Sequence, residues 1–205
     1  MTIVRRKLIF TILLLFIDTS VLASDNKRTA KAQKMHAIKL LADKIALKHD
    51  IHPDLFRALI FQESSWRPKV VSSMGAIGLT QVMPATAKAL CKLNRRELYE
   101  PAKNLECGAK YFASQIKRFN SVEMALCAYN AGPSLVARLG RCPNIRVTKA
   151  YARKIQKQWR EKFWANKNPD WESVLKVKMF KTEPMRQWLL SQSYILQTPL
   201  KLINS

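Results

Sequence analysis

Apolar residues recur at intervals of three and four along most of this chain, and that helical period constrains the fold more than any other feature. No stretch alternates polar and apolar residues as a half-buried strand would. The five glycines all lie between residues 75 and 140, so that block is expected to hold the unusual backbone turns. We predict an all-α fold, or nearly so, with helices at residues 31–49, 53–63, 84–90, 103–119, 122–131 and 147–164.

Size and charge limit the kinds of protein that this chain can be. Its 205 residues suit one domain with extensions, and a hydrophobic content of 48% supports a packed core and excludes wholesale disorder. Lys and Arg number 36 against 14 Asp and Glu, so the formal net charge is +22. Such a charge favours a polyanionic partner, which can be nucleic acid, anionic lipid or an acidic wall polymer.

The first 23 residues have the order of a secretory signal peptide. Residues 5–7 are basic, residues 8–17 are apolar apart from one threonine, and small residues precede a cleavage point near Ala23. We therefore predict an exported, periplasmic protein, with an uncleaved N-terminal anchor as the alternative. Export argues against DNA or RNA, so no nucleic-acid partner is expected.

Four cysteines agree with an oxidising compartment, where an even number is typical of disulfides. Three pairings are open, and we favour the one that closes two short loops of similar length, with four reduced and buried cysteines as the alternative. No Cys-x-x-Cys pair or histidine cluster is present, so neither a metal nor another cofactor is expected. The favoured disulfides are Cys91–Cys107 and Cys127–Cys142.

Glu63 is the carboxylate that the sequence isolates as a catalyst. It ends a helix rich in apolar residues and is the only carboxylate between Asp54 and Glu97. Apolar surroundings raise the pKa of a carboxyl and keep it protonated near neutral pH, as a general acid requires. The alternative is a helix-end glutamate that faces solvent or bonds a neighbouring amide.

Several blocks of sequence around and after Glu63 form a recognisable pattern. They are Glu63-Ser64, Ser72-Ser73-Met74-Gly75-Ala76-Ile77-Gly78-Leu79-Thr80-Gln81-Val82-Met83-Pro84, Ala128-Tyr129-Asn130-Ala131-Gly132 and, more loosely, Thr148-Lys149-Ala150-Tyr151. Together these blocks resemble the lytic transglycosylase family with a goose-lysozyme-like fold. The resemblance covers roughly residues 40–160, and the chain departs from the family pattern at Thr80, at Cys127 and at Val147.

The resemblance implies cleavage of the β-1,4 bond between N-acetylmuramic acid and N-acetylglucosamine in peptidoglycan, without water. Glu63 would protonate the leaving oxygen and then help the C6 hydroxyl of the sugar to attack C1, which gives a 1,6-anhydro ring. Ordinary glycosidases use two carboxylates, so the acid-free surroundings of Glu63 fit the scheme with one. The alternatives are a hydrolytic muramidase and a catalytically weak glycan-binding assembly factor.

The resemblance also implies a substrate groove around Glu63. Ser72 would lie near Glu63 or the N-acetyl group and hold charge that develops in the transition state. Gly75 and Gly78 would let the backbone approach the glycan, with plain turns as the alternative. The other residues expected to contact the sugar, line the groove or orient Glu63 are Gln81, Met83, Tyr129, Asn130 and Tyr151.

Three segments therefore follow from the sequence: a signal peptide at residues 1–23, a catalytic domain at 24–165 and a basic extension at 166–205. Between residues 141 and 205, 14 Lys or Arg stand against four Asp or Glu. The charge and tryptophans of the extension suit an anionic surface, and packing on the core is the alternative. The expected partners are peptidoglycan strands and, by analogy with small specialised members of the family, a secretion, conjugation or pilus apparatus.

Overall fold

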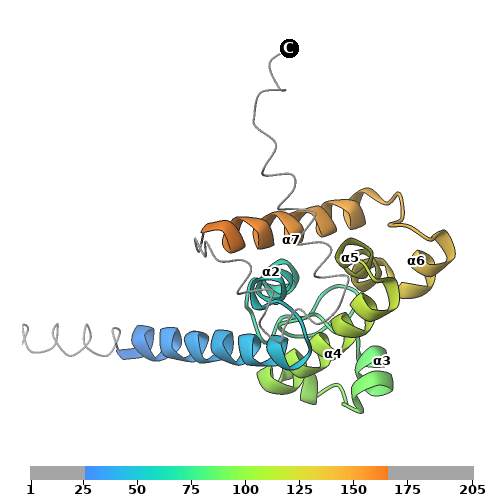
Figure 1. Ribbon diagram of the computed structural model, residues 1–205. Coiled ribbons are helices and arrows are strands. Elements are labelled where there is room, and N and C mark those ends of the chain that lie inside the picture. Colours follow the sequence, from blue (N-terminus) through green and yellow to red (C-terminus); the bar gives the residue numbers. More distant parts are fainter. Residues whose placement is uncertain (1–25, 166–205) are drawn as a thin grey trace, which may run out of the picture. The chain divides into compact units, whose positions relative to one another are not determined.

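The computed structural model describes residues 26–165, and Figure 1 shows how the helices are arranged. The predicted signal peptide and basic extension lie outside these residues. The chain divides into two compact units, Met1–Leu40 and Leu41–Ser205, and helices α2 to α7 with the candidate site lie in the second. After a helix at residues 26–48 come α2 (Pro53–Ser64), α3 (Pro84–Thr86), a π-helical turn η1 (Ala87–Cys91), a 3-10 turn η2 (Glu97–Tyr99), α4 (Pro101–Phe119), α5 (Val122–Ala131), α6 (Pro133–Leu139) and α7 (Arg146–Ala165).

The ends of α2 show why these residues form a helix here. His52 caps the N-terminus by accepting a hydrogen bond from the backbone N–H of Asp54 at 3.1 Å, and Pro53 occupies the first turn, where its missing N–H costs nothing. At the other end, Ser65 adopts a left-handed conformation with φ of 50° and stops the helix. This sharp stop fixes the direction in which the last side chains of α2 point.

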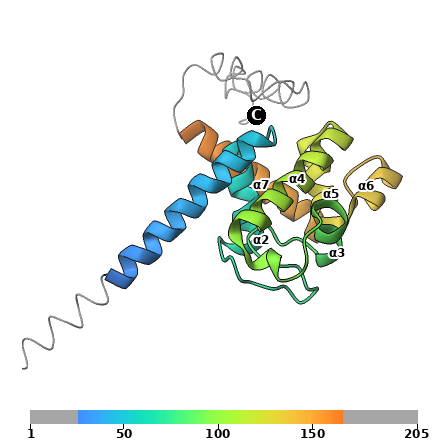
Figure 2. The same cartoon turned by 90° about the horizontal axis from the view of Figure 1, so that it is seen from below.

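Helix α5 lies at the centre of the packing. It contacts α4, α6 and α7, while α2 packs along α7, and both views show α7 passing close to α2 and α5 (Figures 1 and 2). Burial of apolar side chains supplies most of the stability of such an assembly. The largest fully buried side chains include those of Phe56, Leu59, Leu105, Phe112, Leu126 and Trp159.

The all-α expectation is confirmed for residues 26–165, where the extended backbone is limited to two isolated bridges, Val71 with Ile77 and Ile77 with Val82. Two elements were missed by the sequence analysis, η2 and α6. The first described helix begins by residue 26 rather than 31. Within the described residues, no helix is both long and apolar enough to cross a membrane.

Both disulfides join a helix to the chain segment beside it. Cys91 pairs with Cys107 and Cys127 pairs with Cys142, with Cα–Cα distances of 5.7 and 5.6 Å. This is the pairing that the short loops favoured. The first bond ties η1 to α4, and the second ties the segment after α6 to α5, so both stabilise the frame around α4 and α5.

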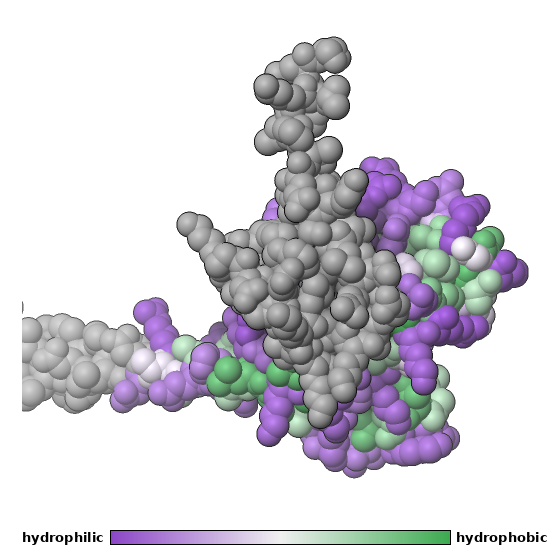
Figure 3. Space-filling model, viewed as in Figure 1, coloured by the Kyte–Doolittle hydropathy of each residue, from purple (hydrophilic) through white to green (hydrophobic). Residues whose placement is uncertain are grey.

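On the face shown in Figure 3, hydrophilic residues cover most of the described surface and hydrophobic patches lie among them. Several large apolar side chains are exposed. Scattered exposure of this kind is ordinary in a soluble domain, but apolar groups that line a groove point to a function. The most exposed of these residues are Leu40, Phe61, Met74, Ile145 and Val147.

Candidate active site

Glu63 lies one residue before the end of α2, where the backbone turns sharply. The next residue, Ser64, is buried, and its hydroxyl donates to the backbone carbonyl of Leu79 at 2.8 Å. Ser65 and Trp66 then take two successive left-handed conformations, with φ of 50° and 63°. Left-handed backbone is costly for residues other than glycine, and such strain concentrates at functional sites.

The Glu63 carboxyl is part-buried and contacts a tyrosine from a distant helix. The hydroxyl of Tyr151 on α7 donates to Oε1 of Glu63 at 2.5 Å. Burial raises the pKa of Glu63 from 4.5 to about 7, and the bond from Tyr151 lowers it by less. The group is therefore divided between its protonated and ionised forms near neutral pH, which suits an acid that must also act as a base.

Tyr129 on α5 is the second tyrosine of the site. Its hydroxyl donates to the carbonyl of Thr80 at 2.8 Å, and its ring packs against Tyr111 and Phe112 at centroid distances of 5.1 and 5.8 Å. Burial, followed by the negative charge of Glu63, raises the pKa of Tyr129 well above the usual value of a tyrosine, and the same holds for Tyr151. Both hydroxyls therefore remain protonated donors.

Asn130 is exposed beside Tyr129, at the end of α5. Its side-chain oxygen accepts a hydrogen bond from the buried hydroxyl of Thr148 on α7 at 2.9 Å. This bond ties the end of α5 to the first turns of α7, three residues before Tyr151. Asn130 therefore joins the two helices that carry the tyrosines.

The loop between α2 and α3, residues 65–83, forms the other side of the site. Ser72 closes a turn within this α2–α3 loop, because its hydroxyl accepts from the N–H of Ala76 at 3.0 Å. Gln81 takes a left-handed conformation with φ of 49°, and its amide nitrogen donates to the carbonyls of Val70 and Gly78. The loop is thus shaped by its own polar groups.

Asn104 on α4 fastens the α2–α3 loop to the helical frame. Its side-chain oxygen accepts from the N–H and the hydroxyl of Thr80 at 2.9 and 2.7 Å. Its amide nitrogen donates to the carbonyls of Ile77 and Leu98 at 2.8 and 3.0 Å. All of these groups are buried, so each bond replaces one that water would otherwise make. We call these four bonds the Asn104 clasp.

The two glycines of the loop have different roles, and the expectation for Gly78 is wrong. Gly78 has φ of +82°, and a Cβ there would lie 2.3 Å from the Asn104 amide and 2.8 Å from the Leu98 carbonyl. It therefore faces the clasp and not a groove. Gly75 has φ of +85° and open space around it, so a backbone approach by a ligand remains a prediction there.

Glu63 and Tyr151 are in direct contact, and the charge of Glu63 reaches Tyr129. Ser72 and Gln81 direct their hydrogen bonds into their own loop, and Met83 is exposed at the start of α3 with 41% of its surface accessible. Thr80 also belongs to this loop, but its side chain is fully buried and forms no part of the outer surface. For these loop residues, substrate contact stays a prediction.

Sequence reasoning missed three residues that shape the site, and each left a weak signal. Ser64 was seen as part of a Glu-Ser pair but received no role. Thr148 stood in the loosest block, next to Val147, without a partner. Asn104 lies beside Leu105 on the inner, apolar face of an amphipathic helix. A polar side chain at such a position needs a buried hydrogen-bond partner, because water cannot reach it. Within residues 26–165, no group of three or more His, Cys, Asp or Glu converges as a metal site would need.

Comparison with known proteins identifies the class. The chain belongs to the family of the transglycosylase SLT domain, which matches residues 41–160. It is 36% identical over 110 residues to a transglycosylase of Enterobacteria phage PRD1, covering 54% of this chain and 38% of that protein. It is 39% identical over 95 residues to the soluble lytic murein transglycosylase of Salmonella typhimurium, covering 42% of this chain and 15% of that protein.

Solved structures agree on the fold. The crystal structure of the 70 kDa soluble lytic transglycosylase of Escherichia coli matches with a TM-score of 0.55 and 28% identity over 58% of this chain and 23% of that one. A complex of the 70-kDa soluble lytic transglycosylase with bulgecin A matches at 0.55 and 26%, over 60% of this chain and 24% of that one. The chain thus shares an all-α fold with lytic transglycosylases but spans well under half the length of these relatives.

Proposed function

We propose that this protein is a peptidoglycan lytic transglycosylase in which Glu63 is the single general acid and base. The observation that carries the proposal is the part-buried Glu63 carboxyl, with its pKa raised to about 7, held by a tyrosine of α7. Membership of the SLT family and relatives named lytic murein transglycosylases support the substrate class.

In the first step, protonated Glu63 donates its proton to the oxygen that links N-acetylmuramic acid to N-acetylglucosamine. The C1–O bond breaks, the leaving sugar takes the proton and its bonding electrons, and positive charge develops at C1. A carboxyl with a pKa near 7 can hold the proton at neutral pH and release it in the transition state. Ionised Glu63 is then stabilised by the hydroxyl of Tyr151.

In the second step, Glu63 takes the proton of the C6 hydroxyl of the muramic acid while that oxygen attacks C1. The product is a 1,6-anhydro ring, and Glu63 ends the cycle protonated as it began. The sequence holds no other carboxylate between Asp54 and Glu97, which favours this scheme over hydrolysis by a carboxylate pair.

Around Glu63 we assign substrate contact to Ser72, Gly75, Gln81, Met83, Tyr129 and Asn130. The carbonyls of the α2–α3 loop and the amide of Asn130 offer groups that can bond sugar hydroxyls and N-acetyl groups. The substrate lies outside the cytoplasm, so this function requires export by the predicted leader and makes peptidoglycan strands the primary partner. A link to an envelope-spanning apparatus remains a proposal from family analogy.

The test is to digest purified sacculi with the wild type and the Glu63→Gln variant and to analyse the products by mass spectrometry. We expect 1,6-anhydro-muramic ends from the wild type and a loss of about 10²–10⁴-fold for the variant. Glu161→Gln, which changes an exposed glutamate of α7, is the matched control and should remain fully active. Reducing ends in place of anhydro ends would identify a hydrolase, and cleavage by Glu63→Gln above a tenth of wild type would remove the assignment.

A further inference from the structure

A groove lies away from the residues of the active site. It is lined by one face of α4, by residues 41–48 at the end of the first described helix and by the loop after η1. Its volume is about 960 Å³. None of the residues assigned to catalysis or substrate binding lines it. Its apolar surface comes from Leu41, Ile45, Leu47, Leu93, Ala102 and the Cys91–Cys107 disulfide.

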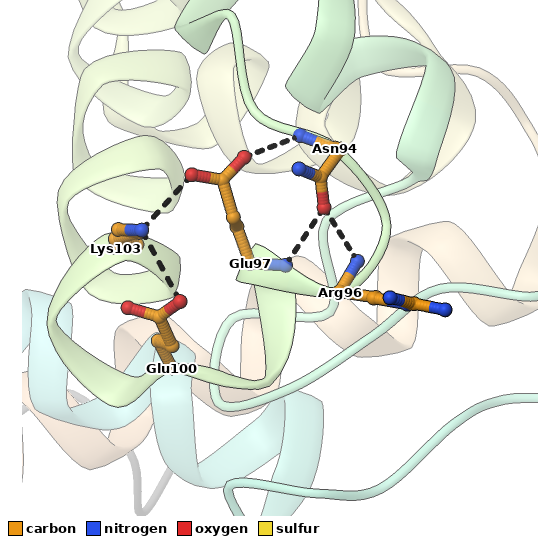
Figure 4. Close-up of polar contacts among 5 residues, drawn as sticks. All are labelled: Asn94, Arg96, Glu97, Glu100 and Lys103. Carbon is orange, nitrogen blue, oxygen red and sulfur yellow. Dashed lines mark hydrogen bonds and ion pairs between the residues drawn. The ribbon is translucent and has the colours of Figure 1, made fainter.

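The walls of this groove, which we call the α4 groove, are fixed by covalent and polar links. The disulfide joins the η1 side to α4, and Lys110 donates to the carbonyl of Leu90 at 2.9 Å. Figure 4 shows a third link, in which Glu97 accepts from the backbone N–H of Asn94 at 2.8 Å and from Lys103 of α4 at 2.9 Å. A preformed groove needs little ordering when a ligand enters, so its apolar surface is available for binding.

Charge around the α4 groove is unevenly compensated. Lys103 contacts both Glu97 and Glu100, and Lys48 contacts Glu106, which also bonds His49. Lys44 and Lys110 also line the groove, and neither forms an ion pair with a carboxylate in the described part of the chain. Two ammonium groups without a carboxylate partner among residues 26–165 thus stand beside an apolar surface.

We propose that the α4 groove is a docking site for an acidic amphipathic helix of a partner protein. Apolar side chains spaced three and four residues apart would enter between the two helices, as in other helix-in-groove contacts. Carboxylates on the flanks of the partner helix would face Lys44 and Lys110. The volume of about 960 Å³ exceeds what one side chain fills and suits several anchors.

The shape and the charge favour this occupant over two others. An anionic membrane needs apolar side chains that project into it, whereas these line a depression between helices. Residues 166–205 of this chain carry six Lys or Arg and three Asp or Glu, so their net charge opposes entry beside the two lysines. An acidic amphipathic helix would cover the apolar surface with its apolar face and would place carboxylates beside the two lysines.

The test is a selection of displayed 15-residue helical peptides on the full-length protein, with counterselection on the bare support, followed by binding of the enriched peptides to the Leu47→Glu variant. Leu47 is 40% exposed in the groove, and Leu139→Glu, which changes a residue 38% exposed on α6, is the matched control. We expect enriched peptides to carry apolar residues at helical spacing with Asp or Glu on the flanks. Their binding should fall about tenfold for Leu47→Glu and stay unchanged for Leu139→Glu.

Charge gives an independent readout. Lys110→Gln removes one of the two charges and should weaken binding of the same peptides while reducing its salt dependence, whereas Lys154→Gln on α7 should change neither. Enrichment of basic or neutral peptides, or binding equal in wild type and Leu47→Glu, would overturn the proposal. Displacement by phosphatidylglycerol vesicles or by a synthetic peptide of residues 166–205 would also overturn it, by assigning the groove to lipid or to the chain itself. Glycan cleavage should be the same in all of these variants, so the outcome is separate from the proposed reaction.

Discussion

The α2–α3 loop and the helices that support it both bury apolar side chains, but the loop depends much more on side-chain hydrogen bonds. The helices α4, α5 and α7 bury apolar side chains such as Leu105, Leu126 and Ile155, and small changes of shape there are absorbed by repacking. The loop also buries Ile77, Leu79 and Val82, but its turns take their shape from hydrogen bonds of Ser64, of Asn104 and of its own residues. The comparison teaches that polar bonds, which depend on direction, set the precise geometry beside Glu63, while burial sets the stability.

The sharpest way to separate these two contributions is to change neighbouring residues of α4. Asn104→Ala removes the clasp and leaves buried groups of the loop unpaired, while Leu105→Ala leaves a cavity in the core. We expect each to lower the free energy of unfolding by about 3–5 kcal/mol. Only Asn104→Ala should also lower activity per folded molecule, because only it releases the loop. Urea denaturation and cleavage of sacculi, both scaled to folded protein, measure the two effects.

Equal activity losses for Asn104→Ala and Leu105→Ala would contradict this separation. It would mean that any loss of stability in α4 reaches the loop, and that the clasp holds no special position. Asn104→Asp is a useful third variant, since it keeps the acceptor for Thr80 but loses the donor to Ile77 and Leu98.

The two loop glycines extend the comparison from α4 into the loop itself. Gly78 and Gly75 share a positive φ, but only Gly78 faces atoms that a Cβ would strike. Gly75→Ala should therefore cost only the backbone strain of about 1 kcal/mol, and Gly78→Ala about 2–4 kcal/mol because crowding adds to it. Thermal unfolding of the two variants measures the difference. Equal costs would show that the backbone conformation alone demands glycine at both positions.

The effect of Glu63 on the stability of the folded protein should depend on pH. Its pKa is raised in the folded protein to about 7 from 4.5, so the fold favours the protonated form. That preference is fully satisfied below pH 4.5 and becomes a cost as pH rises through 7. Glu63→Gln should therefore match the wild type at pH 4 and exceed its free energy of unfolding by about 2–3 kcal/mol at pH 9, below the full value because the carboxyl keeps some solvent. The exposed Glu161→Gln should show no such trend.

The local sequence pattern predicts the helices of this molecule much better than it predicts the contacts of the active site. The spacing of apolar residues predicts α4, α5 and α7 to within a few residues, because each buries one face over several turns. Helix α6 has only seven residues, too few for a period to show, although Pro133 and Gly140 mark its two ends. Gly75 and Gly78 look alike in sequence, and their difference depends on Asn104, which lies far along the chain. The contact of Tyr151 with Glu63 spans 88 residues and needs the packing of α7 on α2.

The last prediction tests the long-range contact between Tyr151 and Glu63. Tyr151→Phe keeps the ring in its packed position and removes the hydroxyl that donates to Glu63. The bond lowers the pKa of Glu63, so its loss should raise that pKa and shift the alkaline limb of the pH–activity profile to higher pH. Activity at pH 6 should fall about tenfold, which corresponds to one hydrogen bond to a charged group. Tyr111→Phe is the control, since Tyr111 packs on Tyr129 without bonding Glu63, and it should leave the pH–activity profile unchanged.

A uniform loss of activity in Tyr151→Phe, with both limbs of the profile unmoved, would mean that Tyr151 contacts the sugar rather than positioning the acid. That result would transfer the control of Glu63 from α7 to the end of α2 and the α2–α3 loop, where Ser64 and Gln81, respectively, would be the next residues to change.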